Sequence, residues 1–384
     1  MSQTSVDIAV VTDPRFSGGT ASSVISDVAS FLRLGLSVGL VLIRSRFFDS
    51  SADQANPQVL ALRDLPGVKV MGGEVHANLA FLHHPMAFFR GVEDTIAIRA
   101  PSSVLVAHHP PFRGDGSLEY NPLTVERQVL RSLGCRPRWS PVSGTIRAQL
   151  RCFAPFLALT CEDWVNTFDA GSWRAELPAF TDGRAVVGRH GRADALKWPE
   201  RFEEAVGPLS PGAGWKTRIM GLPPGLEQQI AAAGVDWDLV PFNAEPVPDF
   251  LRSLDAFCYF YHRLWVEAFG RTIGEAILME RPCVLDPRLE ANFGELAYYC
   301  RPAEATACLE HLRTHPQATQ NACRVARSRA VERFGDASIA RRLRALFADP
   351  GTRSRLGPKS ATAPQTLRKV VGLALREQAE ATSV

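Results

Sequence analysis

The sequence predicts an α/β protein built from two Rossmann-like domains, each with a parallel sheet, and three observations carry this prediction. The chain has 384 residues, a length that most often makes two domains. Its first forty residues alternate as strand, glycine loop, helix and strand, a unit that implies a parallel sheet. The same alternation restarts at residue 185, after a segment rich in small and polar residues over 170–184 that we interpret as a linker.

The first β-α-β unit is readable from spacing alone. Residues 6–12 are an apolar run that ends at an Asp-Pro pair, which predicts a buried strand and its stop. Apolar positions at helical spacing over 21–34 predict a helix that Gly35 ends in the C′ position. Residues 36–43 predict the next strand. The loop before the helix has paired glycines but no G-x-G-x-x-G, so the dinucleotide fingerprint is absent.

The rest of the first half predicts further strands over residues 68–71, 104–107 and 156–160. His108 and His109 follow the second of these, at the sheet edge where parallel α/β sheets bind ligands. The basic run 127–151 is interpreted as a solvated charged face. An anionic acceptor or a peripheral membrane contact is the alternative for it.

The second half predicts five strands, over residues 185–188, 217–220, 237–240, 256–261 and 282–285. Arg189, Arg192 and Lys197 cluster in the turn after the first of them. Guanidinium and ammonium groups in such a turn would neutralise a diphosphate. Helices are expected over 337–347 and 367–378, with a Pro/Gly/Ser/Thr-rich linker over 349–363 between them.

The stretch 265–286 organises the functional prediction. Gly270 breaks an apolar strand pattern, and residues 271–279 fit a helix with one buried face. Glu267 therefore lies in the strand-to-helix loop, and Glu275 lies early in the helix. The helix N-terminus attracts an anion, and carboxylates beside it accept hydrogen bonds from hydroxyls. Phosphate at the centre and hydroxyls at the sides suit a nucleotide sugar.

Composition excludes several other classes. The formal charge of +3 does not imply a nucleic-acid partner. Eight scattered cysteines contain no C-x-x-C pair, and no Asp-x-Asp cluster offers a metal site, so we expect neither a metal nor a cofactor. No basic, apolar leader and no span of about 20 apolar residues is present, which predicts a cytoplasmic protein.

The run from Glu267 to Glu275 resembles the E-x-F-G-x-x-x-x-E signature of retaining GT-B glycosyltransferases, in particular family 4. The resemblance implies the GT-B fold, with two parallel sheets facing across a cleft. It implies an acceptor-binding domain over residues 1–175 and a nucleotide-sugar-binding domain over 183–348. Residues 349–384 would then be a linker and a helix that packs back on the first domain. One departure is Glu280-Arg281, where the family usually has a small residue and Gly.

The resemblance also implies roles for individual residues. The transferred sugar would contact Glu267 and either His108 or His109, with His109 preferred. The diphosphate would be held by Lys197 and by Arg189, with Arg192 as the competing arginine. The remaining contacts to the donor would come from Gly18, Gly19, Phe242, Phe269, Gly270, Arg271 and Glu275, where Phe242 meets the base and Glu275 the ribose.

These implications give a metal-independent, hexosyltransferase-like, retaining glycosyltransferase. It would move a sugar from a UDP- or GDP-linked donor to a hydroxyl of a saccharide or glycoconjugate, in glycan biosynthesis. Two alternatives stay open. One is a GT-B sugar-nucleotide epimerase or phosphorylase, and the other is a non-catalytic protein that binds sugar nucleotides.

Overall fold

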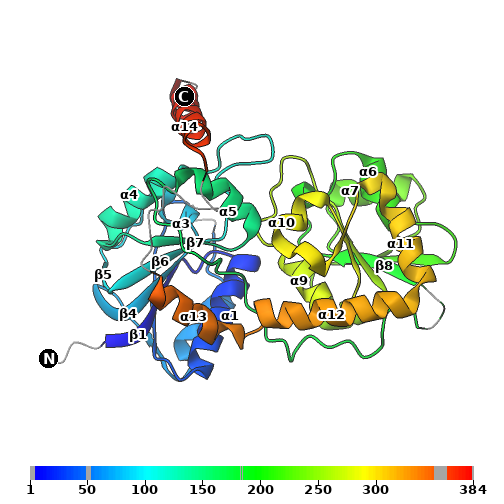
Figure 1. Ribbon diagram of the computed structural model, residues 1–384, viewed down its shortest axis with the longest axis horizontal. Helices are drawn as coiled ribbons and strands as arrows, with labels where there is room; N and C mark the ends of the chain where they lie inside the picture. Colours follow the sequence, from blue (N-terminus) through cyan, green and yellow to red (C-terminus); the bar gives the residue numbers. More distant parts are fainter. Residues whose placement is uncertain (1–4, 49–52, 182, 184, 350–360, 383–384) are drawn as a thin grey trace. The chain divides into compact units, whose positions relative to one another are not determined.

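The computed structural model describes residues 5–48, 53–181, 183, 185–349 and 361–382 (Figure 1). These residues form two compact units. The first comprises Met1–Thr167 together with Ala337–Val384, and the second comprises Phe168–Asp336. Most of the predicted linker over 349–363 lies outside the described residues.

The first unit contains a seven-stranded parallel sheet in the order β3-β2-β1-β4-β6-β7, with β5 paired to β4. Its strands are β1 (Ser5–Thr12), β2 (Val38–Leu42), β3 (Val68–Val70), β4 (Glu74–His83), β5 (Ala97–Arg99), β6 (Ser102–Ala107) and β7 (Arg138–Pro141). Its helices are α1 (Gly19–Arg33), α2 (Pro57–Leu60), α3 (Met86–Phe89), α4 (Pro122–Leu133), α5 (Gly144–Leu150), α13 (Ser338–Ala348) and α14 (Ala363–Thr382).

The second unit contains a six-stranded parallel sheet in the order β10-β9-β8-β11-β12-β13. Its strands are β8 (Ala185–His190), β9 (Trp215–Met220), β10 (Asp238–Val240), β11 (Ala256–Tyr259), β12 (Cys283–Leu285) and β13 (Tyr298–Tyr299). Its helices are α6 (Phe202–Val206), α7 (Pro224–Ala232), α8 (Val247–Arg252), α9 (Arg271–Leu278), α10 (Glu290–Phe293), α11 (Ala305–Thr314) and α12 (Pro316–Phe334).

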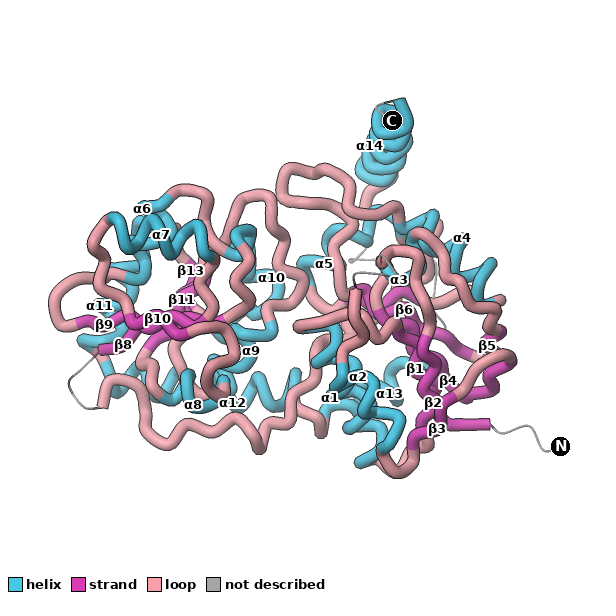
Figure 2. The backbone as a smooth tube through the Cα atoms, turned by 180° about the vertical axis from the view of Figure 1, so that it is seen from behind, coloured by secondary structure: helices cyan, strands magenta, loops and turns pink. Residues whose placement is uncertain are grey.

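Both sheets have the doubly wound Rossmann arrangement. Numbered along the main path, each has the strand order 3-2-1-4-5-6, and helices cover both faces of each sheet (Figure 2). The order reverses between β1 and β4 in the first unit and between β8 and β11 in the second. Ligands of such sheets bind beyond the carboxyl ends of the strands at this reversal. The fold class predicted from the sequence, two Rossmann-like domains, is confirmed.

The first β-α-β unit forms as its sequence predicts. Helix α1 buries Val24, Val28 and Phe31 against the sheet. Gly35 adopts a φ of +75°, and its N–H donates to the Leu32 carbonyl. The next N–H donates to the Phe31 carbonyl, which completes a Schellman ending that a glycine in the left-handed region makes without strain.

The first sheet also contains strands that the sequence did not predict. Strand β4 pairs with both β1 and β6 at the centre of the sheet. Strand β7 lies inside the basic run 127–151, and its Trp139 is fully buried with its indole N–H donated to Glu126. The strand predicted over 156–160 is wrong, because this segment contributes one isolated bridge, from Leu159 to Trp139.

Helix α13 belongs to the first unit, although the predicted second domain extended to residue 348. It buries Ile339, Leu343 and Leu346, and it lies beside α1 (Figures 1 and 2). The buried guanidinium of Arg342 donates to the Val165 carbonyl. The chain therefore leaves the first unit once and returns to it.

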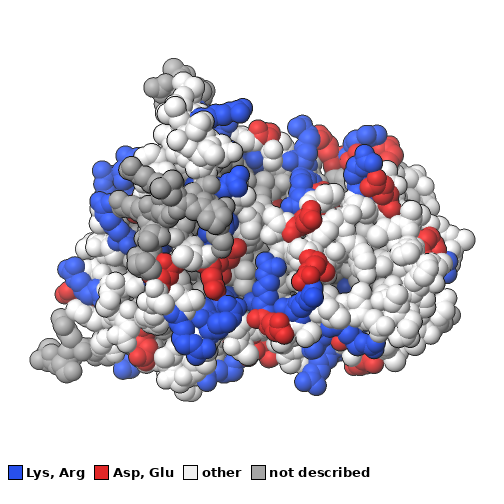
Figure 3. Space-filling view, in the orientation of Figure 1, with Lys and Arg blue, Asp and Glu red and all other residues white. Residues whose placement is uncertain are grey.

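The surface carries both signs of charge. Lys and Arg side chains are interspersed with Asp and Glu on the face that Figure 3 draws, in keeping with the small net charge of +3. Among the described residues, no helix is both long and apolar enough to cross a membrane.

Candidate functional site

The candidate site of the second unit lies at the carboxyl edge of its sheet, where the strand order reverses. Strand β8 ends at His190 and leads through a short 3-10 turn, Ala195–Lys197, while β11 leads through a loop to the start of α9. This topology brings Lys197 to Glu267, with 3.4 Å between the ammonium nitrogen and Oε2. The two residues are 70 positions apart in the chain.

Glu267 is buried, 8% exposed, and one of its oxygens accepts several donors. The Tyr259 hydroxyl donates to Oε2 at 2.8 Å and the Trp265 indole N–H at 3.2 Å. Burial favours the neutral acid, but the Lys197 ammonium and these two hydrogen bonds outweigh it and lower the pKa of Glu267 below its ordinary value. Oε1 accepts no hydrogen bond from the residues that the structure describes. An ionised carboxylate with one open oxygen suits a substrate hydroxyl or a developing positive charge.

Arg189 is buried next to this pair and is held by the protein itself. Its guanidinium lies 4.1 Å from the ring centroids of both Trp198 and Tyr259. It donates to the Phe260 carbonyl at 2.8 Å and to the Lys197 carbonyl at 2.7 Å. Desolvation lowers the pKa of this guanidinium. As placed, Arg189 fixes the backbone that carries Lys197.

The loop before α9 is shaped by Gly270 and Asn292. Gly270 precedes the helix with a φ of +88°, and a Cβ on it would approach the Ile273 side chain to 2.9 Å. The Asn292 amide donates to the carbonyls of Glu267 and Phe269 at 3.2 Å and of the intervening alanine at 3.4 Å. Within the described residues, the peptide N–H groups of Phe269 and Gly270 have no hydrogen-bond acceptor. The helix start therefore presents donors suited to an anion.

The Phe269 ring itself is turned away from these donors. It is 3% exposed and packs in a cluster with Phe168, Phe293 and Phe334. Only the backbone at this position is available to a ligand. Arg271, also predicted to contact the donor, places its guanidinium 4.3 Å from the Phe168 ring centroid and its Nε 3.3 Å from Glu275.

Glu275 is buried one turn into α9, beside His190. Burial raises the pKa of Glu275 to about 7, although Arg271 opposes this shift. Burial, with the charges of Arg189 and Lys197, lowers the pKa of His190 to about 3. The His190 Nε2 lies 3.4 Å from Glu275 Oε2 but has no hydrogen-bond partner among the described residues. A sugar hydroxyl, which both donates and accepts, would satisfy both groups.

The two remaining predictions in this unit fall on more open positions. Arg192 is half-exposed, with its Nη2 4.0 Å from Asp194. Phe242 follows the end of β10 and is 45% exposed, beside Gly221. The structure thus brings Glu267, Lys197 and the start of α9 together and leaves Arg192 and Phe242 in the surrounding loops.

In the first unit, Gly18 and Gly19 open helix α1 at the carboxyl edge of the sheet. Gly18 occupies the N-cap with a φ of +61°, and no side chain caps the helix. A Cβ on Gly19 would meet nothing within 4 Å. The paired glycines therefore leave the backbone at this helix start uncovered by their own side chains.

The histidines of the first unit form a cluster beyond the ends of β4 and β6. The buried His108 has its Nε2 3.0 Å from the Nδ1 of His83, and His109 lies 3.6 Å from Glu119 with a more accessible side chain. Sequence reasoning missed His84, which follows β4 at the strand-order reversal. It has a φ of +73°, and its ring stacks on the Phe16 ring with 4.1 Å between the ring centroids.

The sequence prediction also missed His190, although the sequence contained a signal for both histidines. His84 directly follows an apolar run, and His190 stands between Arg189 and Arg192, which were predicted to bind the diphosphate. A positive φ is uncommon for any residue other than glycine and often marks a functional position. That conformation becomes visible only in the structure.

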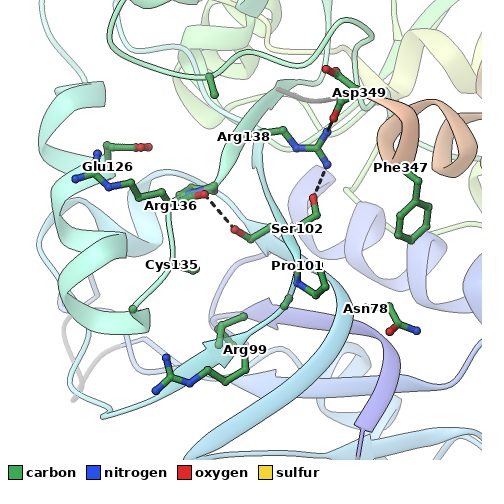
Figure 4. A pocket seen from close by; sticks show the side chains of 16 residues that line it. Asn78, Arg99, Pro101, Ser102, Glu126, Cys135, Arg136, Arg138, Phe347 and Asp349 are labelled. Atoms are coloured by element: carbon green, nitrogen blue, oxygen red, sulfur yellow. Dashed lines mark hydrogen bonds between the residues drawn. The ribbon is translucent and has the colours of Figure 1, made fainter. Parts of the chain in front are cut away.

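A cavity of about 1120 Å³ lies in the first unit, away from these groups. Figure 4 shows Arg138 and Ser102, which begin β7 and β6, on its wall. Arg138 donates to the Ser102 hydroxyl and to the carbonyl of Asp349, so its guanidinium is already engaged. This cavity is at the amino ends of the strands, opposite to the edge where such sheets bind ligands. Among the described residues, no group of three His, Cys, Asp or Glu side chains is placed to hold a metal ion.

Neither a protein-family model nor a curated protein matches the sequence. The structure, however, is similar to several solved structures. HepE of Anabaena in complex with UDP-glucose is 16% identical, with a TM-score of 0.63, over 89% of this chain and 99% of that one. A glycosyltransferase of Rickettsia africae is 11% identical, with a TM-score of 0.58, over 90% and 98%. The lipopolysaccharide outer core galactosyltransferase WaaB is 14% identical, with a TM-score of 0.55, over 89% and 99%. These likenesses, together with the two doubly wound sheets, show that the chain has the two-domain GT-B fold.

Proposed function

We propose that this protein is a retaining glycosyltransferase that moves a sugar from a nucleoside diphosphate to an acceptor hydroxyl. The observation that carries the proposal is the Lys197–Glu267 pair in front of the uncapped start of α9, with Glu275 one turn into the helix. A cation, peptide donors and two carboxylates with opposite pKa shifts meet at one edge of the sheet. This combination suits a ligand that is anionic at its centre and rich in hydroxyls on both sides.

Each group has a role in the proposed reaction. Lys197 and the Phe269 and Gly270 peptide N–H groups bind the diphosphate and stabilise its charge as it leaves. Glu267, kept ionised by its surroundings, faces the transferred sugar and stabilises the positive charge at the anomeric carbon. Glu275 and His190 bind the ribose hydroxyls. Arg189 acts through Lys197, whose carbonyl it holds.

In the transfer step, the bond between the anomeric carbon and the diphosphate oxygen breaks, and its electron pair goes to that oxygen. The acceptor hydroxyl oxygen bonds to the same carbon on the same face of the sugar. The hydroxyl proton passes to the leaving diphosphate. Retention follows from the resemblance of the Glu267–Glu275 run to the retaining family, and leaving-group stabilisation by Lys197 requires no metal ion.

A uridine donor is favoured over a guanosine donor. The similar HepE structure holds UDP-glucose, and a similar TarM structure holds UDP. The half-exposed Phe242 ring beyond β10 would stack on the base. The acceptor is a saccharide or glycoconjugate hydroxyl, and Gly18, Gly19 and His109 of the first unit remain predicted contacts to the donor.

The test is release of free nucleoside diphosphate from a panel of UDP- and GDP-sugars, with and without saccharide acceptors and with and without EDTA. We expect release that depends on the acceptor, survives chelation and yields a product with the anomeric configuration of the donor. Phosphate-dependent release would indicate a phosphorylase, and release with an altered free sugar and no acceptor would indicate an epimerase. Binding without turnover of any donor would indicate a non-catalytic protein, and loss of turnover in EDTA with recovery in Mg²⁺ would refute metal independence.

A further inference from the structure

Helix α14 has an apolar stripe that the described part of the first unit leaves uncovered. Leu367, Val371 and Leu375 are spaced by four residues along α14 and therefore lie on one side of it. Their exposed fractions are 66%, 48% and 61%. On the opposite side, Leu373 is only 3% exposed. A helix in water normally presents polar side chains outward, so this stripe calls for an occupant.

The inner side of α14 is held to the first unit, which keeps the stripe outward. The Lys369 ammonium lies 4.3 Å from the Phe112 ring centroid, and the Arg376 guanidinium lies 5.6 Å from it. Both long side chains extend along the helix so that their charged ends contact this ring. The stripe therefore cannot turn inward without breaking these contacts.

The described residues next to the stripe are basic. Residues 361–376 contain Arg368, Lys369 and Arg376 and no Asp or Glu. Arg368, Lys369 and Arg376 join Arg151 in lining a cavity of about 360 Å³ beside the helix. None of these four cations forms an ion pair with a carboxylate in the described part of the chain. An anionic group is the complement of this cavity.

We propose that α14 docks the first unit onto the surface of an anionic lipid bilayer. Leu367, Val371 and Leu375 would enter the boundary between headgroups and acyl chains, as apolar faces of interfacial helices do. Arg151, Arg368 and the cavity that they line would meet the headgroup phosphates. The proposal rests on α14 and the cavity beside it and is independent of sugar transfer.

A second copy of the chain fits this face less well. Two α14 helices packed stripe to stripe would bring their Arg368 side chains together, and like charges repel. A stripe of three side chains also falls short of the roughly 800 Å² per partner that a stable interface buries. A bilayer offers the opposite charge and an unlimited apolar area.

The test is co-sedimentation of the full chain with vesicles of phosphatidylcholine alone and with vesicles that also contain the anionic lipid phosphatidylglycerol. We compare the wild type with the Leu367→Ser, Leu375→Ser double variant. The matched control is Leu177→Ser with Val325→Ser, two side chains of similar exposure (65% and 51%) in the second unit. Thermal unfolding of all three proteins verifies that they fold.

We expect binding to the anionic vesicles, weakened about a hundredfold in the α14 variant and unchanged in the control. Raising the salt concentration should also weaken it, because the Debye length shortens. Absence of binding to anionic vesicles, or equal binding by the α14 variant, would overturn the proposal. So would a concentration-dependent dimer that the α14 variant abolishes without any vesicle binding, which would assign the face to a second copy.

Discussion

At the scale of single residues, the chemistry depends on how Glu267 is surrounded. Its Oε2 receives a tyrosine hydroxyl, an indole N–H and the Lys197 ammonium, and these partners keep a buried carboxylate ionised. The Lys197 ammonium forms an ion pair with Glu267 in the structure, and in the proposed complex it would also bind the diphosphate. Arg192, half-exposed and next to Asp194, has no such position.

Replacing Lys197 with Ala should therefore weaken diphosphate binding more than replacing Arg192 with Ala. A charge-assisted contact is worth about 1.5–3 kcal/mol, or roughly ten- to hundredfold in affinity. Calorimetry with UDP and with uridine separates the two parts of the ligand, and uridine binding should change little. Equal losses in the two variants, or no loss in Lys197→Ala, would refute the assignment of Lys197 to the phosphate.

The two glutamates should fail differently when each becomes Gln. Glu267 faces the charge that develops at the anomeric carbon, so its variant should lose mainly kcat, by about 10²–10³-fold. Glu275 contacts the unreactive ribose before and during the reaction, so its variant should mainly raise KM. Steady-state kinetics on both variants decides this, and an unchanged kcat in Glu267→Gln would remove the main ground for a transferase.

Glu275 should also make stability depend on pH. Its folded pKa of about 7 lies above the ordinary value of 4.5, so the folded state binds the proton more tightly than the unfolded state. The stabilisation is full below about pH 4.5 and is lost as pH rises through 7, which amounts to about 3 kcal/mol. Denaturant unfolding at a series of pH values should show this decline in the wild type and not in Glu275→Gln. Parallel curves for the two proteins would contradict the buried, protonated carboxyl.

The residue types at the candidate site were readable from the sequence, but their partners were not. The offset from Glu267 to Glu275 fixes both on one loop and helix, because it is local. That Tyr259 and Trp265 share one oxygen of Glu267 depends on the path of the loop after β11. That His190 reaches Glu275 depends on how β8 and β11 pair. The expected grip of Arg189 on a diphosphate remains a prediction, while in the structure its donors are directed to backbone carbonyls.

At the scale of elements, the loop before α9 depends on Gly270. Gly270→Ala should destabilise the protein by about 2–3 kcal/mol, because the left-handed conformation disfavours a Cβ and the Ile273 side chain lies in its way. Gly35→Ala is the matched control, with a similar φ of +75° and nothing within 4 Å. It should cost only about 1–2 kcal/mol.

Urea unfolding measures both losses, and UDP affinity measures whether the loop has moved. We expect weaker UDP binding in Gly270→Ala and unchanged binding in Gly35→Ala. Equal destabilisation in the two variants would mean that the close approach at Gly270 has no cost.

The sequence predicted the strands whose own residues form a continuous apolar run and missed those without one. Strands β1 and β8 are apolar runs bounded by turn residues, and both were predicted. Strand β4 was not predicted because His76 and Asn78 interrupt its apolar pattern. Strand β7 was hidden by its flanking arginines, although the burial of Trp139 gives it a core position.

At the scale of the whole molecule, the chain leaves the first unit at residue 167 and re-enters it at 337. The re-entry is held by Arg342 of α13, which is 3% exposed and donates to the Val165 carbonyl and the Thr167 hydroxyl. Its guanidinium also lies 4.8 Å from the Trp164 ring centroid. Sequence reasoning assigned this helix to the second domain because its basic amphipathic pattern does not show which sheet it covers.

Replacing Arg342 with Met should therefore destabilise the first unit while UDP binding persists. Removing the guanidinium takes away the hydrogen bonds that Arg342 donates to the Val165 carbonyl and the Thr167 hydroxyl, at a cost of about 3 kcal/mol. The exposed Arg344 on the same helix is the matched control, and Arg344→Met should change stability by less than about 0.5 kcal/mol.

Hydrogen exchange should show faster opening in residues 164–167 and α13 only in Arg342→Met. Addition of UDP at 100 times its dissociation constant should still stabilise that variant by about 2.7 kcal/mol, with protection at residues 267–275. If Arg342→Met abolished this protection while Arg344→Met did not, UDP binding at residues 267–275 would depend on the folding of the first unit, contrary to our expectation.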